Sequence, residues 1–214
     1  DDRFTLTETF ERHLSKYPGP IGQNVWYLAG VLLIVVRVIQ LSSGIWLLMN
    51  YVATTEDAFA SIQYIMRDVD YGWIIRYMHT TGSSMFFLLI YLHMFRGLLY
   101  GSYQKPRELL WILGWLTYII LVAEGFTGYV LPWGQMSFWA AQVILSLIGS
   151  IPIFGEELLT WIRGDYLISG ITLNRLFAFH VVLLPLALIA VVFVHIVALH
   201  EVGSNNLEGI DIKK

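Results

Sequence analysis

Hydrophobic residues along this chain gather into four long runs that are separated by shorter polar segments. The runs cover residues 25–51, 71–100, 109–130 and 171–200. A helix that crosses a bilayer needs about 20 predominantly apolar residues, and each run meets that length. The pattern therefore predicts an all-α membrane protein built as a bundle of four transmembrane helices, with a surface loop over residues 52–70.

The stretch over residues 133–163, between the third and fourth runs, is amphipathic and is broken at Pro152 and Gly155. It is too interrupted to cross a membrane, and it predicts a pair of helices that lie at the membrane interface. The polar residues 1–24 are predicted to form an N-terminal interfacial segment, which leaves residues 25–214 as a single transmembrane domain.

Basic residues are distributed unevenly between the two ends of these runs. The two termini and the turn between the second and third runs hold Arg3, Arg12, Lys16, Arg96, Lys105, Arg107, Lys213 and Lys214, whereas the other loops and their helix ends hold Arg67, Arg76 and Arg163. Cytoplasmic loops of membrane proteins carry the excess of Lys and Arg. We therefore expect a multi-pass protein with both ends of this chain in the cytoplasm.

Composition supports the membrane assignment and narrows the chemistry. The 214 residues are 57% hydrophobic and 14% charged, with a formal net charge of -3, which is typical of an integral membrane protein, and we expect no nucleic-acid partner. The chain has no cysteine, which excludes disulfides, thiolate-bound iron–sulfur clusters and haem attached through thioethers.

Four histidines lie inside the second and fourth runs. His79 and His93 are 14 residues apart, which in a helix is about 21 Å of rise and about 40° of rotation, so they share one face. His180 and His195 are 15 residues apart, or about 22 Å and about 60°. Because both runs cross in the same direction, His79 should match His180 in depth near the outer face, and His93 should match His195 near the inner face.

Ionisable residues inside a membrane are costly and usually functional, and imidazole binds iron, copper and zinc. The histidine pattern therefore predicts two stacked bis-histidine sites. The alternative is that the histidines hydrogen-bond across helices in a haem-free channel or transporter.

Glycines in the first and third runs repeat the same interval. Gly30 and Gly44 are 14 residues apart, as are Gly114 and Gly128. Glycine inside a helix costs about 0.5 to 1 kcal/mol relative to alanine, so its repetition indicates a flat, bulky group close to the backbone. Two stacked haems satisfy all the histidine and glycine positions, whereas zinc or copper would not need the glycines. Pro185 can kink the fourth span and absorb its one additional residue.

Two arginines flank the histidines of the second run. Arg76 precedes His79 by three residues, and Arg96 follows His93 by three. Each lies one turn closer to the nearer membrane surface, where it can meet a haem propionate. Arginines that snorkel to the surface are the alternative.

Several longer segments resemble one family over nearly the whole chain, from about Trp26 to Lys214. They include ASIQYIMRDVDYGWIIRYMH, LHMFRGLLYGSYQKPREL, GYVLPWGQMSFW, IRGDYLISGITLNRLFAFH and LHEVGSNN. These segments are similar to the N-terminal, haem-binding half of cytochrome b from the respiratory ubiquinol:cytochrome c oxidoreductase, in its proteobacterial form. The resemblance implies a di-haem subunit that carries electrons across a bacterial inner membrane, from an outer quinol-oxidising site to an inner quinone-reducing site.

The resemblance also implies roles for individual residues. The low-potential outer haem would be bound without covalent attachment by His79 and His180, and the high-potential inner haem by His93 and His195. The outer quinone site would contain Phe126, Tyr129, Gly134, Met136 and Ala140, and the inner one His200 and Ser204. The implied partners are a Rieske-type iron–sulfur protein, a cytochrome c-type subunit and the remaining cytochrome b helices, on the same or another chain, within a dimeric complex.

The chain departs from the family pattern at several points. Full-length family proteins continue through further spans that carry a proline–glutamate motif of the outer site and an acidic residue of the inner site. We therefore expect this chain to be one piece of a split protein or part of a longer one, and to be inactive alone. Ala140 replaces a usual glycine, which predicts weaker binding of bulky inhibitors at the outer site.

Two other di-haem proteins are alternatives. The short cytochrome b of photosynthetic chains carries a cysteine for an extra haem, and Leu28 stands at about that position. A di-haem anchor subunit of a hydrogenase or formate dehydrogenase would lack the PWGQMSFW motif.

Arg37 is the unusual residue of the first run. It lies seven residues from both Gly30 and Gly44, midway between the two predicted haems, where the family normally has an apolar residue. An unpaired arginine there would cost several kcal/mol, and Glu124, at about the same depth, is a candidate partner. We expect Arg37 to raise the potential of a nearby haem; a side chain that turns toward another helix or snorkels is the alternative.

Overall fold

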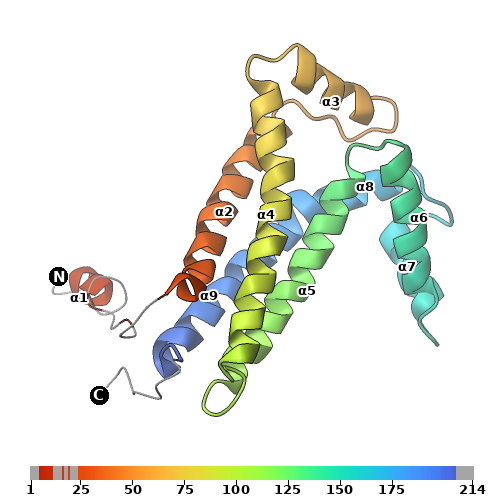
Figure 1. The fold of residues 1–214 in the computed structure, drawn as a ribbon. Coiled ribbons are helices and arrows are strands. Elements are labelled where there is room, and N and C mark those ends of the chain that lie inside the picture. The colour runs from red at the N-terminus through yellow and green to blue at the C-terminus, as the bar shows by residue number, and fades with distance from the viewer. Residues whose placement is uncertain (1–4, 12–15, 17–18, 20–23, 206–214) are drawn as a thin grey trace.

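The computed structural model describes residues 5–11, 16, 19 and 24–205 (Figure 1). Its helices are α1 (Leu6–Phe10), α2 (Val25–Leu48), α3 (Ala58–Arg67), α4 (Gly72–Leu99), α5 (Glu108–Val130), α6 (Gln135–Gly149), α7 (Gly155–Arg163), α8 (Gly170–Ala178), the π-helix η2 (Phe179–Leu183) and α9 (Leu184–Val202). No strand occurs in the described residues, and four helical segments are long and apolar enough to cross a membrane. The prediction of an all-α protein with four membrane-spanning helices is confirmed.

The four spanning segments pack as two pairs. α2 packs against α4, and α5 packs against the continuous helical segment Gly170–Val202, which joins α8, η2 and α9. A buried apolar cluster of Ile90, Leu121 and Leu188 connects the pairs. Each of these residues lies between the two predicted site positions of its own helix, so the cluster separates the two sites along the bundle.

The two ends of the bundle differ (Figure 1). The start of α2, the α4–α5 turn and the end of α9 lie at the lower end of the figure, α3 lies at the upper end, and α6 and α7 run down its right side. α6 and α7 pack together and lie within the predicted helix pair of residues 133–163, and their place at a membrane interface stays a prediction.

Tyr51, which follows α2, ties the upper end together. Its hydroxyl donates a hydrogen bond of 2.6 Å to the carbonyl of Leu131, and its ring packs against Phe177. Burial raises the pKa of Tyr51 well above its ordinary value, so the hydroxyl keeps its proton and remains a donor.

The loop predicted over residues 52–70 contains a helix, so this part of the prediction is wrong. α3 buries Ala58, Ser61 and Ile65, which share one helical face, and it packs against α4. Of the predicted N-terminal segment 1–24, α1 and a few other residues are described, and the rest lies outside the described residues. The division of the chain at this point stays a prediction.

A π-helical turn takes up the additional residue between His180 and His195. In η2 the N–H of Leu184 bonds to the carbonyl of Phe179, five residues back, and a π turn accommodates one more residue than an α turn. Pro185 follows directly and has no N–H for a regular helical bond. The π turn that contains His180 therefore takes up the additional residue. The sequence alone attributes this irregularity to Pro185, which lies just after the turn.

Candidate functional site

His79 of α4 and His180 of η2 face each other in the upper half of the bundle. Their ring centroids are 6.2 Å apart, and the rings are nearly perpendicular, at 87°. Nδ1 of His79 lies 3.0 Å from Oγ of Ser43, and that hydroxyl donates its own hydrogen to the carbonyl of Ile39. Ser43 therefore accepts from His79, which places the proton on Nδ1 and leaves the lone pair of Nε2 for a ligand.

His180 is held in the same tautomer by Glu124 of α5. Its Nδ1 atom lies 3.1 Å from the backbone oxygen of Glu124 and 3.2 Å from the side-chain Oε1 atom. The backbone oxygen can only accept a hydrogen bond, so Nδ1 carries the proton and Nε2 is free to coordinate a metal.

His93 of α4 and His195 of α9 form the corresponding pair in the lower half. Their ring centroids are 6.4 Å apart, with 66° between the planes. Nδ1 of His195 is buried beside the backbone of Leu110 but makes no hydrogen bond of normal geometry within the described residues. The inner pair therefore lacks a side-chain acceptor comparable to Glu124.

Both ring separations fit one metal ion between the two imidazoles. Two imidazoles that bind an ion from opposite sides at about 2.0 Å have centroids about 6.3 Å apart. Among the described residues, no group of three or more His, Cys, Asp or Glu side chains could hold a bare ion, whereas zinc sites use three or four protein ligands. A pair of histidines would suit the iron of a haem, because the macrocycle supplies the other ligands.

Each predicted glycine faces one of these histidines across a helix interface. A Cβ atom built on the glycine would approach Cε1 of the facing ring to 3.3 Å for Gly30 and His93, 3.1 Å for Gly44 and His79, 3.3 Å for Gly114 and His195, and 2.4 Å for Gly128 and His180. The sequence attributed the glycine interval to a flat group beside the backbone. In the structure the imidazole rings themselves lie there, so a side chain would displace a ring, most strongly at Gly128.

The two predicted propionate arginines lie toward opposite ends of α4. Arg76 is half-buried, and its guanidinium makes no ion pair with a described residue. Arg96 stacks on the rings of Tyr27 and Tyr100, at 4.4 and 4.9 Å from their centroids, and donates to the carbonyl of Asn205 at 2.7 Å. Its Nε atom is buried without a partner among the described residues, so Arg96 retains a donor for an anionic group.

The partner suggested for Arg37 is corrected by the structure. Arg37 forms no ion pair with Glu124; its guanidinium donates instead to the carbonyl of Pro185 at 3.1 Å. A backbone carbonyl of a neighbouring helix thus solvates the arginine inside the bundle.

The residues predicted for the quinone sites separate into two groups. The outer group lies at the C-terminal end of α5 and in the start of α6: Phe126, Tyr129, Gly134, Met136 and Ala140. Phe126 packs against a buried cluster around Val130, whereas the side chain of Met136 is largely exposed. His200 and Ser204 lie at and beyond the end of α9, at the lower end. The two groups thus lie at opposite ends of the bundle.

Two polar residues of α2 at the outer site were missed in the sequence. Ser43 contacts the His79 ring, and Gln40 donates to the backbone carbonyl of His79 at 2.8 Å. Both lie within about one turn of Gly44 in an otherwise apolar run, and this position was the only available signal.

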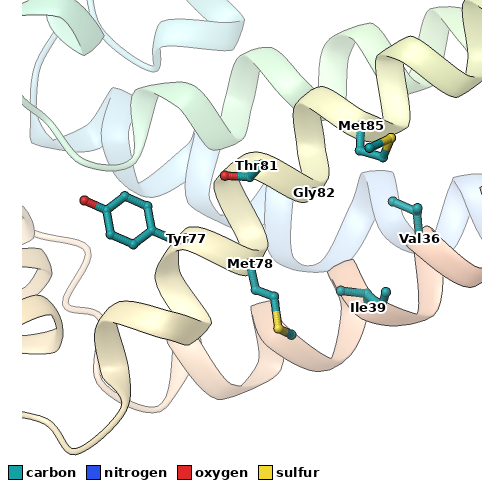
Figure 2. Close-up of a pocket in the computed structure, with 7 residues that line it drawn as sticks. All are labelled: Val36, Ile39, Tyr77, Met78, Thr81, Gly82 and Met85. Atoms are coloured by element: carbon teal, nitrogen blue, oxygen red, sulfur yellow. The ribbon is translucent and has the colours of Figure 1, made fainter.

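A hollow of about 400 Å³ lies between α2 and α4, and Figure 2 shows its lining residues. These residues are Val36, Ile39, Tyr77, Met78, Thr81, Gly82 and Met85. The hollow is apolar and open, and it includes none of the predicted ligands. It is therefore separate from the histidine sites.

Comparison of the sequence with known proteins matches this chain to cytochrome b proteins. The family model described as cytochrome b/b6/petB matches residues 14–203. The chain is 59% identical over 214 residues to cytochrome b of Allochromatium vinosum and covers all of itself and 51% of that protein. It is 47% identical over 213 residues to cytochrome b of Rhodospirillum rubrum, of which it covers 52%.

A solved structure titled "Hyperthermophilic respiratory Complex III" matches over 100% of this chain and 57% of its own, with a TM-score of 0.90 and 36% identity. The chain spans about half the length of the curated relatives it matches. Because the family model matches most of the sequence, the chain belongs to the cytochrome b/b6 family.

Proposed function

We propose that residues 25–214 form the di-haem part of a b-type cytochrome, a subunit of a respiratory quinol:cytochrome c oxidoreductase. The chain would carry electrons across a bacterial inner membrane, from an outer quinol-oxidising site to an inner quinone-reducing site. The observation that carries the proposal is the presence of two facing histidine pairs at different depths, each with the ring separation of a bis-imidazole metal site.

Three sets of residues in the bundle would hold the two haems: histidines, glycines and arginines. His79 and His180 would hold the iron of the outer haem, and His93 and His195 would hold that of the inner haem. The facing glycines allow the imidazole rings to approach the neighbouring helices. Arg76 and Arg96 would bind propionates through charge-assisted hydrogen bonds. When bound, a b-type haem supplies reversible one-electron redox chemistry.

The residues proposed for the two quinone sites lie at opposite ends of the bundle, which supports one site toward each side of the membrane. Phe126, Tyr129, Gly134, Met136 and Ala140 would form part of the outer site, and His200 and Ser204 part of the inner site. The chain covers about half of its relatives, so the remaining helices of cytochrome b would complete both sites. A Rieske-type iron–sulfur protein and a cytochrome c-type subunit would exchange electrons with this membrane subunit in a dimeric complex, with both ends of this chain on the cytoplasmic side.

A redox titration of the visible spectrum tests the proposal. In the purified membrane complex, we expect a reduced-minus-oxidised spectrum with two b-type components of different midpoint potential and about two non-covalent haems per chain. A complex that contains the intact chain but shows no haem absorption would contradict the proposal and favour a haem-free channel or transporter.

Arg37 is expected to raise the midpoint potential of the outer component. It binds the carbonyl of Pro185, which is five residues from His180 and ten from His195. A unit charge about 10 Å from a redox centre contributes about 1.7 kcal/mol at an effective dielectric constant of about 20, or about 70 mV for one electron. Arg37→Leu should therefore lower the outer midpoint by up to this amount in a redox titration.

The control for this experiment is Arg67→Leu, which removes the same charge from an exposed position at the end of α3. It should leave both midpoints in place. Unchanged midpoints in Arg37→Leu would show that the guanidinium is solvated by the bundle without affecting either site.

A further inference from the structure

The two histidines of the outer pair have different hydrogen-bond acceptors on Nδ1. His79 donates to the neutral hydroxyl of Ser43, whereas His180 lies within hydrogen-bonding distance of the side chain of Glu124 as well as its backbone oxygen. Among the described residues, His180 is the one predicted ligand whose Nδ1 atom lies beside a buried carboxyl group. The asymmetry therefore distinguishes the outer site from the inner one.

We propose that Glu124 is a positioning residue that strengthens His180 as a metal ligand and lowers the midpoint potential of the outer haem. This inference rests on the proposed function, because it assumes that His180 coordinates iron. It assigns part of the difference in potential between the two sites to one side chain of α5. That difference favours electron movement from the outer site to the inner site.

The physical basis is the polarisation of the imidazole. A carboxylate that accepts the Nδ1 hydrogen fixes the ring orientation and increases the basicity of Nε2. A more basic axial ligand stabilises the ferric state relative to the ferrous state, which lowers the potential. When ionised, the carboxylate would act in the same direction, because ferric iron has one more positive charge than ferrous iron.

The surroundings of Glu124 support a role toward His180. Its side chain is 18% exposed, and its Oε2 atom is buried without a hydrogen-bond partner among the described residues. The longer-range charge of Arg37 faces it from α2, while the neighbouring Thr127 hydroxyl donates only to backbone carbonyls. The close contact with His180 and the longer-range interaction with Arg37 are thus the side-chain interactions available to offset part of the cost of burying this carboxyl group.

Glu124→Gln in the complete membrane complex tests the proposal, because glutamine keeps the shape and an acceptor oxygen but removes the charge. We expect the outer component to become easier to reduce, with about a tenfold change in its oxidised-to-reduced ratio at a fixed potential, equivalent to about 59 mV for one electron. The inner midpoint should stay in place. The low-temperature EPR g-values of the outer ferric haem should also change, because they depend on the strength and orientation of its histidine ligands.

Glu108→Gln is the matched control, because Glu108 is an exposed glutamate at the start of the same helix, about 24 Å away along its axis. If Glu124→Gln does not assemble, Glu124→Asp, which keeps the charge but withdraws the carboxylate by one methylene, should give a smaller rise of the outer midpoint.

Two normal b-type components with an unchanged outer midpoint and unchanged g-values in the assembled variant would overturn the role of Glu124 and leave the proposed function intact. Absence of haem from the unmodified complex would instead overturn the proposed function itself.

Discussion

Replacing His93 by alanine is expected to remove one of two b-type haems and to leave the other in place. His93 and His195 form one site, and His79 and His180 form another, about 21 Å away along α4. Each proposed site would have two histidines as its protein ligands to the iron, so loss of one imidazole would leave a single protein ligand there. The other pair keeps both rings and their hydrogen bonds.

Two measurements on the purified complex check this result. The haem content per chain should fall from about two to about one, and the redox titration should retain a single b-type component, the one of lower midpoint potential. His180→Ala should give the complementary result, with the component of higher midpoint potential retained. Circular dichroism of both variants should show nearly unchanged helix content, because each substitution leaves the apolar surfaces of the spans intact.

His200→Ala provides the matched control, since His200 lies in α9 outside the four-histidine pattern. It should retain both haems. Loss of a haem in this variant, or loss of both in His93→Ala with helix content preserved, would contradict the pairing of histidines by depth.

The helical bundle and its histidine positions could be predicted from the sequence because both depend on local periodicity. Long apolar runs specify membrane spans without reference to neighbours, and a spacing of 14 residues specifies a helix face. α3 was missed because it is short and because its buried residues, Ala58, Ser61 and Ile65, include a polar one. The spacing of these residues is that of one helix face, so a helical signal was present in the sequence and was overlooked in so short a segment.

The hydrogen bonds around the site could not be derived in the same way. The guanidinium of Arg37 binds a backbone carbonyl, and every residue of a neighbouring helix offers one. Ser43 and Glu124 contact the histidines because α2 and α5 are rotated so that these side chains face the histidine-bearing helices. That rotation is set by packing across the bundle, which a single sequence does not display.

The π turn could be predicted from the sequence only in part. The unequal spacings of 14 and 15 residues are visible in the sequence, and they require some irregularity in the fourth span. Its location at Phe179–Leu183 depends on which backbone bonds are exchanged in the folded helix. The turn places His180 where it can contact Glu124 and the backbone of Gly128 at once.

Gly128→Ala is expected to disrupt the outer site, whereas Gly114→Ala is expected to preserve the inner site. A Cβ on Gly128 would lie 2.4 Å from Cε1, 2.9 Å from Nδ1 and 3.0 Å from Nε2 of His180, but a Cβ on Gly114 would lie 3.3 Å from Cε1 of His195. The first set of distances is well inside van der Waals contact, so the ring or the helix must move. Forcing additional volume into a packed interior costs about 1 to 3 kcal/mol.

The His180 ring has little freedom to escape this overlap. Glu124 holds its Nδ1 atom from α5, the same helix that carries Gly128, and the π turn fixes its backbone. In Gly128→Ala we therefore expect the outer b-type component to be lost or its midpoint to shift, with the inner component unchanged. Haem content and a redox titration of the assembled complex measure both effects.

Gly114→Ala adds the same methyl group at the corresponding position one site lower, so it separates the steric effect from the general effect of replacing a helical glycine. Alanine is favoured over glycine inside a helix by about 0.5 to 1 kcal/mol, and a contact of 3.3 Å needs only a small adjustment of His195. The thermal midpoint of this variant should therefore be equal to or higher than that of the unmodified complex, with both haems retained. Equal behaviour of the two variants would mean that the glycines serve helix approach in general, and that the close contact between Gly128 and His180 does not limit the outer site.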